Sequence, residues 1–354
     1  MKPAAPAKAL TYTPARDFVP EPGEPASLSD GIFWLRMPLP FELNHINLWL
    51  LEGPRGWSLV DTGFNYAETQ QHWDRLFSGP LAAKPVENIF VTHFHPDHFG
   101  LGAMLSARTG LTVQMTQPEF DMARNLGGDT ADMDKLERDY RGYYTEAGLD
   151  ETLLIEMLAR RFGYRKMVPA LPAAITPVKP GQTVTLGGRP WKIIGGYGHC
   201  PEHACLYDAA NGILISGDIV LPSISPNISL YPGSSGDPVG AYLKTLEDIG
   251  AQCAEDTMVL PSHGVPFTGL HRRLGELRAH HQRRFETLKT VLSAGPATGF
   301  AAMKGLFAHR ELKSFDIFFA LGETLAHLSH EVLRGRITKT LKGDVAIYAL
   351  APEN

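Results

Sequence analysis

The stretch Asn88-Ile89-Phe90-Val91-Thr92-His93-Phe94-His95-Pro96-Asp97-His98 joins an apolar run to a dense set of metal-ligand side chains. The apolar half predicts a buried β-strand, and Pro96 prevents that strand from continuing as a regular ladder. Three histidines and one aspartate then fall within six residues, in a loop at a strand end where α/β proteins place their sites. Imidazole and carboxylate together suit Zn²⁺, Mn²⁺ or Fe²⁺, so this loop predicts a metal site.

Three further residues of the same chemical type stand in similar settings. His199 follows the apolar run 191–195, Asp218 follows 213–215, and His263 follows 258–260. Each lies beside a glycine or proline that predicts a turn at the end of a strand. One such residue is a weak signal, but together they predict that several strand ends supply ligands to one centre.

In chain order, these motifs are Asp61-Thr62-Gly63, then His93-x-His95-x-Asp97-His98, His199, Asp218 and His263. The set resembles the motifs of the metallo-β-lactamase-fold hydrolase superfamily, in a glyoxalase-II-like form, over about residues 30–268. The resemblance implies the α/β fold class: an αββα sandwich with a dinuclear metal site at one edge.

The resemblance also implies a role for each residue. His93, His95 and His199 would hold the first ion; Asp97, His98 and His263 would hold the second; Asp218 would bridge the two. Asp61 would orient ligands through hydrogen bonds, and His203 is expected to support the site rather than to bind metal. The cofactor predicted is a pair of divalent ions, Zn²⁺ before Mn²⁺ or Fe²⁺. Two such ions can share a bridging hydroxide at neutral pH, with Asp97 and Asp218 in the catalytic machinery.

The chain departs from the superfamily pattern at two places. Cys200 stands where Ser or Thr usually follows the third-motif histidine, and we expect a small packed side chain there. Asp218 stands where true β-lactamases often use Cys at the second site, which argues against antibiotic hydrolysis as the primary role.

The rest of the chain predicts four regions. Residues 1–28 are a proline-rich arm, 29–268 the catalytic domain, and 269–354 a linker helix followed by a domain that resembles a winged helix. Within the catalytic domain, residues 117–167 form a helical insertion rich in Met and Tyr. That insertion either walls an apolar pocket for an acyl chain or only packs against the sandwich; the sequence favours neither.

Composition and charge limit the compartment and the partners. Apolar residues make up 44% and charged residues 20%, as in ordinary globular proteins. Three cysteines cannot build a disulfide framework in 354 residues, and no run of about 18 apolar residues occurs, so we expect a cytoplasmic protein without a membrane span. Residues 1–270 hold 20 Lys and Arg against 30 Asp and Glu, which argues against a nucleic-acid partner near the site.

The function predicted first is hydrolysis of an ester, thioester or lactone of a small molecule. Asn227 and Tyr231, in the loop after Asp218, are the residues expected to reach the substrate. The alternative is a phosphodiesterase or ribonuclease of the same fold, with nucleic acid bound by basic residues of the wing, and a homodimer is a further expectation. A non-enzymatic winged-helix protein is disfavoured because the ligand set is complete.

Overall fold

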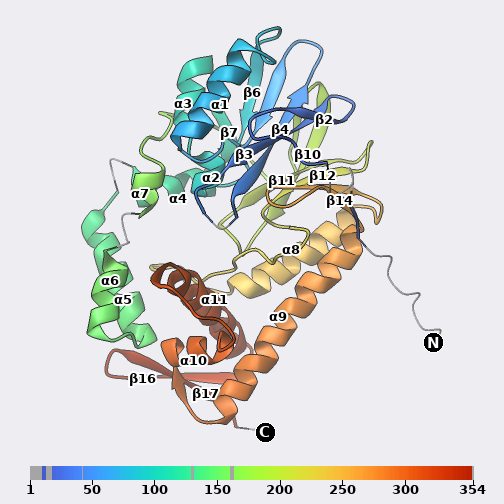
Figure 1. Ribbon diagram of the computed structural model, residues 1–354. Helices are drawn as coiled ribbons and strands as arrows, with labels where there is room; N and C mark the ends of the chain where they lie inside the picture. Colours follow the sequence, from blue (N-terminus) through green and yellow to red (C-terminus); the bar gives the residue numbers. More distant parts are fainter. Residues whose placement is uncertain (1–9, 13–17, 42, 129–130, 160–162, 353–354) are drawn as a thin grey trace, which may run out of the picture.

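The computed structural model describes residues 10–12, 18–41, 43–128, 131–159 and 163–352. Two seven-stranded sheets face each other and are covered by helices on their outer sides (Figure 1). The first sheet has the order β2 (Ala26–Ser29), β3 (Ile32–Pro38), β4 (His45–Glu52), β5 (Trp57–Val60), β6 (Val86–Phe90), β7 (Val113–Thr116) and β8 (Ile175–Val178). The second has the order β1 (Thr11–Tyr12), β14 (Phe267–Thr268), β13 (Met258–Pro261), β12 (Ile213–Gly217), β11 (His203–Asp208), β10 (Arg189–Gly196) and β9 (Thr183–Leu186).

Strand β4 shows why the first sheet has apolar partners on both of its faces. Its sequence is almost continuously apolar rather than alternating, and its central six residues are all buried. Trp49 packs with Trp191 and other side chains between the sheets, whereas Leu48 points to the helical side and packs with Trp73. A strand of this kind needs apolar partners on both faces, which an αββα sandwich provides. The predicted fold class is confirmed.

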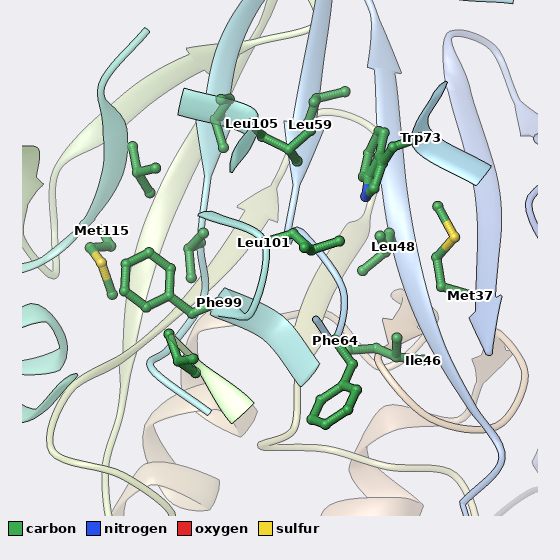
Figure 2. Packing of buried hydrophobic residues seen from close by; sticks show 14 of the residues in the cluster. Met37, Ile46, Leu48, Leu59, Phe64, Trp73, Phe99, Leu101, Leu105 and Met115 are labelled. Carbon is green, nitrogen blue, oxygen red and sulfur yellow. The ribbon is translucent and has the colours of Figure 1, made fainter. Parts of the chain in front are cut away.

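The helices outside the first sheet are α1 (Ala67–Ser78), α2 (Pro96–Phe99), α3 (Gly102–Thr109) and α4 (Gln117–Gly127). Figure 2 shows Trp73 and Leu105 from these helices packed with Leu48, Leu59 and Met115 of the sheet. The second sheet is covered by α8 (Pro238–Gln252) and by the first half of α9 (Leu270–Ser293). Burial of these two outer layers fixes the strand ends that carry the predicted ligands.

A smaller unit follows the sandwich and is built around the second half of α9. It contains β15 (Ala297–Thr298), α10 (Gly299–Leu306), α11 (Ser314–Leu333), β16 (Ile337–Lys342) and β17 (Val345–Leu350). The three strands form their own sheet, in the order β15-β17-β16. None of the helices in the described part of the chain combines the length and apolar character of a membrane span.

The segment 117–167 divides between the two units. Helix α4 and α7 (Gly163–Met167) pack on the sandwich through Phe120 and Tyr164. In contrast, α5 (Met133–Ala147) and α6 (Glu151–Leu158) pack on the C-terminal unit through Tyr144 and Met157, as their position beside α10 and α11 in Figure 1 indicates. The segment therefore connects the two cores.

The segment 1–28, predicted as an arm, is partly ordered into the sheets. β1 pairs antiparallel with β14, and β2 begins at Ala26, inside the predicted arm, and pairs with β3. Residues 1–9 and 13–17 lie outside the described residues.

Candidate metal centre

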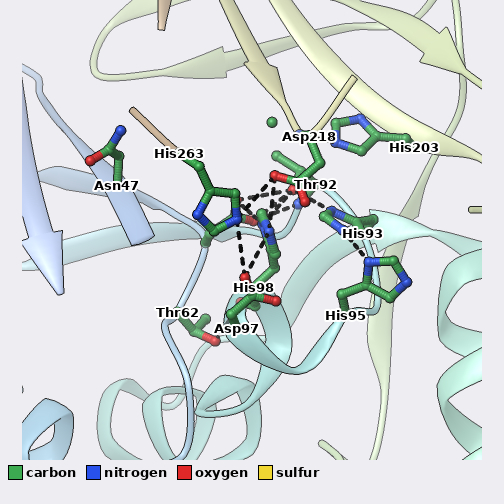
Figure 3. A network of polar contacts seen from close by, with 12 residues as sticks. Asn47, Thr62, Thr92, His93, His95, Asp97, His98, His203, Asp218 and His263 are labelled. Atoms are coloured by element: carbon green, nitrogen blue, oxygen red, sulfur yellow. Dashed lines mark hydrogen bonds and ion pairs between the residues drawn. The ribbon is translucent and has the colours of Figure 1, made fainter. Parts of the chain in front are cut away.

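The predicted ligands lie at adjoining strand ends. His93 and His95 follow β6, Asp97 and His98 lie in the short helix α2, and the other three follow β10, β12 and β13: His199, Asp218 and His263. Only glycine fits at position 198, directly before His199. Its backbone has φ +97°, and a Cβ there would lie 2.3 Å from the carbonyl oxygen of Pro238. Figure 3 shows six of the seven side chains turned toward one another: His93, His95, Asp97, His98, Asp218 and His263.

Four of the seven side chains form a first group. His93 Nε2 lies 2.9 Å from His95 Nδ1 and 3.3 Å from His199 Nε2. His199 Nε2 lies 3.6 Å from Asp218 Oδ2. Their ligand atoms all fall within 4.8 Å of one another, which is close enough for one cation to contact all four.

The remaining three form a second group beside the first. Asp97 Oδ2 lies 3.3 Å from His263 Nε2 and 3.7 Å from His98 Nε2. Asp218 Oδ1 lies 3.5 Å from both of these imidazole nitrogens. Asp218 thus turns one oxygen to each group of ligand atoms.

Hydrogen bonds on the far side of three rings leave their Nε2 atoms facing the centre. His98 Nδ1 donates to Asp61 Oδ2 at 2.8 Å, His199 Nδ1 to the carbonyl of Asn227 at 2.8 Å, and His263 Nδ1 to the carbonyl of His45 at 2.9 Å. A neutral imidazole that donates from Nδ1 keeps a lone pair on Nε2 for a metal.

The centre is charged and buried, and its ionisable groups shift one another's pKa values. Burial opposes ionisation of Asp218, but His263 and His98 outweigh it and hold the pKa of that carboxyl well below its usual range. Burial also opposes charging of His98, yet the carboxylates of Asp97 and Asp61 hold its pKa well above its usual value. By contrast, burial and the neighbouring His199 lower the pKa of His95 to about 3. Burial also lowers the pKa values of His93 and His199, so all three rings of this group favour the neutral form, which is the form that can bind a metal.

Two buried atoms show that the residues fit a bound cation. His98 Nε2 and Asp218 Oδ1 lie 3.5 Å apart, and neither makes a hydrogen bond of ordinary geometry with a described residue. Such atoms cost free energy unless another group satisfies them. A divalent ion satisfies both at once, and the imidazole and carboxylate donors match the ligand preferences of Zn²⁺.

Asp61 is hydrogen-bonded to His98 and to the residue that precedes His93. Besides His98, it accepts hydrogen bonds from the backbone N–H of Thr92 at 2.8 Å and from its hydroxyl at 3.0 Å. Its own backbone has φ +64°, a strained conformation that Asp and Asn tolerate better than most residues. His203 is buried beside the ring of His93 and accepts a hydrogen bond from the backbone N–H of Asp218 at 3.3 Å, so it contacts a ligand's backbone.

The two residues predicted to reach the substrate are both held by other parts of the protein. Asn227 supports His199 through its backbone carbonyl, and its side-chain oxygen accepts a hydrogen bond from Ser229. The ring of Tyr231 lies 6.3 Å from that of Phe318, and burial and the nearby Cys200 raise its pKa. Contact of either residue with substrate remains a prediction.

Sequence reasoning missed Glu119, a fully buried carboxyl in the first turn of α4. One oxygen accepts a hydrogen bond from the backbone N–H of Phe94 at 3.0 Å and the other from that of Glu202 at 2.6 Å. Phe94 lies between two ligand histidines, and Glu202 lies in the loop of His199. Burial raises the pKa of Glu119 to about 7, despite these two bonds. Cys200 is buried against the same carboxyl, in keeping with the small packed residue expected there.

Two facing sheets with a buried His/Asp centre at one edge define a metal-dependent hydrolase. Residues 42–271 match the Metallo-beta-lactamase superfamily, and the chain belongs to that superfamily. Residues 285–349 match the Metallo-beta-lactamase-like, C-terminal domain. That match does not name a winged helix, so the winged-helix assignment of this region is not confirmed.

Several relatives are similar over most of the chain. A beta-lactamase domain protein from Burkholderia ambifaria has a structure 36% identical in sequence, with a TM-score of 0.87, covering 97% of this chain and 98% of that one. A metallo-beta-lactamase family protein from Thermus thermophilus is 27% identical, with a TM-score of 0.77, covering 92% of this chain and all of that one. In sequence, the chain is 24% identical to the probable metallo-hydrolase YqjP of Bacillus subtilis, covering 90% of this chain and 98% of that protein. It is 26% identical to the human acyl-coenzyme A thioesterase MBLAC2, covering 67% of this chain and 79% of that protein.

Proposed function

We propose that this protein is a dinuclear metal-dependent hydrolase of small-molecule thioesters, with acyl-coenzyme A compounds as the class to test first. The observation that carries the dinuclear part is the position of Asp218, whose two oxygens face two separate groups of ligand atoms. The thioester class is supported by the similarity to the acyl-coenzyme A thioesterase MBLAC2, which extends over 67% of this chain.

The chemistry assigns a task to each part of the site. Two bound Zn²⁺ ions would supply a nucleophile at neutral pH and polarise the attacked carbonyl. His93, His95 and His199 would hold one ion, and Asp97, His98 and His263 the other. Asp61 and the carbonyls of Asn227 and His45 keep the rings in the orientation that this requires. Burial of the ligands excludes water that would screen their charges.

A substrate panel tests the proposal directly. The Zn²⁺-loaded protein is assayed by kcat/KM on acyl-coenzyme A thioesters of increasing chain length, aryl esters, lactones, a phosphodiester, a short RNA and an alkyl sulfate. We expect thioesters to lead the phosphodiester and the RNA by about a hundredfold or more, which corresponds to about 2.7 kcal/mol in transition-state stabilisation. The alkyl sulfate belongs in the panel because the chain is 25% identical to the linear primary-alkylsulfatase of a Pseudomonas species. That match covers 62% of this chain and 42% of the sulfatase.

Two variants make the panel interpretable. His95→Ala removes a ligand atom, whereas His309→Ala removes an exposed histidine that follows α10. Activity that survives His95→Ala would come from a contaminant or would contradict the ligand assignment, and His309→Ala should leave all rates unchanged. A lead by the phosphodiester, the RNA or the sulfate ester would overturn the thioester proposal. A metal content of one ion per chain at full activity would overturn the dinuclear part.

A further inference from the structure

We infer that the C-terminal domain positions His199, and that Gly322 in α11 is the positioning residue through which it does so. The inference concerns the metal centre and does not depend on the substrate class.

Hydrogen bonds connect the metal centre to the loop that α11 covers. His199 Nδ1 donates to the carbonyl of Asn227, whose side-chain oxygen accepts from the hydroxyl of Ser229. The next residue, Leu230, donates its backbone N–H to the carbonyl of Gly322 at 3.0 Å. The orientation of His199 is thus set by a loop whose own position is set by α11.

Gly322 allows α11 to approach this loop closely. A Cβ at position 322 would lie 2.7 Å from Oγ of Ser229 and 2.9 Å from its Cβ, distances that force one of the two segments to move. Glycine within a helix is unfavourable compared with alanine. In the middle of α11, the missing Cβ leaves room for the buried Ser229.

The other side of the loop is fixed by α9. Arg273 donates to the carbonyl of Leu221 at 2.6 Å and to that of Ile224 at 2.8 Å. His280 lies 3.3 Å from the hydroxyl of Ser225. Because α9 holds residues 221–225, a push from α11 cannot be absorbed by a shift of the whole loop. The displacement falls on residues 227–230, which include the acceptor for His199.

Gly322→Ala is the direct test, with Gly275→Ala as its matched control. Gly275 lies in α9, and a Cβ there would meet nothing within 4 Å, so the same helix-favouring change is made without the contact. Metal affinity is measured on the full-length chain by competition with a chromophoric chelator, and ligand geometry by the absorption spectrum of the Co²⁺-substituted protein. We expect Gly322→Ala to weaken metal binding at the group that contains His199 by about 10-fold, the low end of what loss of a ligand's supporting contact does elsewhere, and to alter the Co²⁺ spectrum. Affinity and spectrum equal to those of Gly275→Ala would overturn the inference.

Variants of Ser229 decide the matter even if Gly322→Ala fails to fold. Ser229→Ala removes only the hydroxyl that holds Asn227, and it should weaken the same ion with the melting temperature little changed. Ser229→Gly removes both atoms that would lie within 3 Å of the new Cβ, so Gly322→Ala should cost less metal affinity in the Ser229→Gly background than in the wild type. Wild-type affinity in Ser229→Ala, or an equal loss in the two backgrounds, would overturn the inference. These readouts stay valid if the thioester proposal fails, because they use no substrate.

Discussion

Replacing Glu119 with Gln tests the clearest electrostatic feature outside the ligand set. The side chain keeps its volume but loses its charge, and one of its two acceptor oxygens becomes an NH₂ group that faces a backbone N–H. Either Phe94 or Glu202 is then left without its acceptor. A buried unsatisfied donor costs about 1–3 kcal/mol at any pH. In return, the variant no longer bears the cost of a buried charge.

The pH dependence separates these two effects. Burial raises the pKa of Glu119 from 4.5 to about 7, so between these values the folded protein binds more protons at this site than the unfolded chain does. The free energy of unfolding of the wild type must therefore fall as the pH rises through this window. Integrated from pH 5 to pH 8, the shift amounts to about 2.5 kcal/mol, and the variant loses none of it.

The assay is urea unfolding of the metal-free proteins, in chelator, at several pH values from 5 to 8. We expect the variant to be less stable than the wild type at pH 5, with the difference moving in its favour by about 2.5 kcal/mol by pH 8. Other titrating groups cancel in the comparison, and Glu311→Gln, at an exposed position, is the control for loss of a carboxyl. Parallel stability curves for the two proteins would refute the argument that Glu119 bears the cost of burial.

Three further predictions concern the metal. His95→Ala should abolish metal retention at the first group together with activity, measured by metal analysis and turnover of the same sample; retention of both would refute the ligand assignment. Asp61→Asn keeps a residue that tolerates φ +64° but removes the charge beside His98. Metal affinity should then fall by about 10- to 100-fold in a chelator competition, and an unchanged affinity would contradict the supporting role of Asp61. Metal affinity should also fall as the pH is lowered, because His98 and His263 must lose their protons to bind a metal. Neighbouring carboxylates raise the pKa values of both rings against the opposing effect of burial. An affinity independent of pH from 8 to 5.5 would count against this prediction.

The strands and the ligand loops were predictable because local patterns encode them. The run before His93 is a buried strand in the structure, β6, and the apolar runs before His199, Asp218 and His263 are β10, β12 and β13. Apolar runs that end at glycine or proline report burial and chain reversal, both of which are properties of a few neighbouring residues. The convergence of these loops followed only from the order of the motifs and the resemblance to a known fold.

The supporting residues were not predictable for a physical reason. Glu119 lies in the first turn of a helix, where an acidic side chain interacts favourably with the helix dipole. Its presence in the sequence therefore needs no other explanation. Its two partners lie 25 and 83 residues away in the chain, and both offer backbone N–H groups that no side-chain pattern reveals. Asn227 was predicted as a substrate residue because its side chain is polar, whereas its contact with His199 uses the carbonyl that every residue carries.

The difference between ligand residues and the residues that orient them predicts how strongly each variant reduces metal affinity. Removal of a ligand atom, as in His95→Ala, deletes a metal bond and should abolish binding at that group. Asp61→Asn leaves every ligand atom in place and weakens the hydrogen bond that orients one ring. Gly322→Ala acts one step further away, through Ser229 and the carbonyl of Asn227, so it changes the position of a ring and not its hydrogen bond directly. Metal affinity should therefore fall most in His95→Ala, less in Asp61→Asn and least in Gly322→Ala. A Gly322→Ala protein that binds metal as poorly as His95→Ala would mean that the C-terminal domain is needed to form the centre, and not merely to position it.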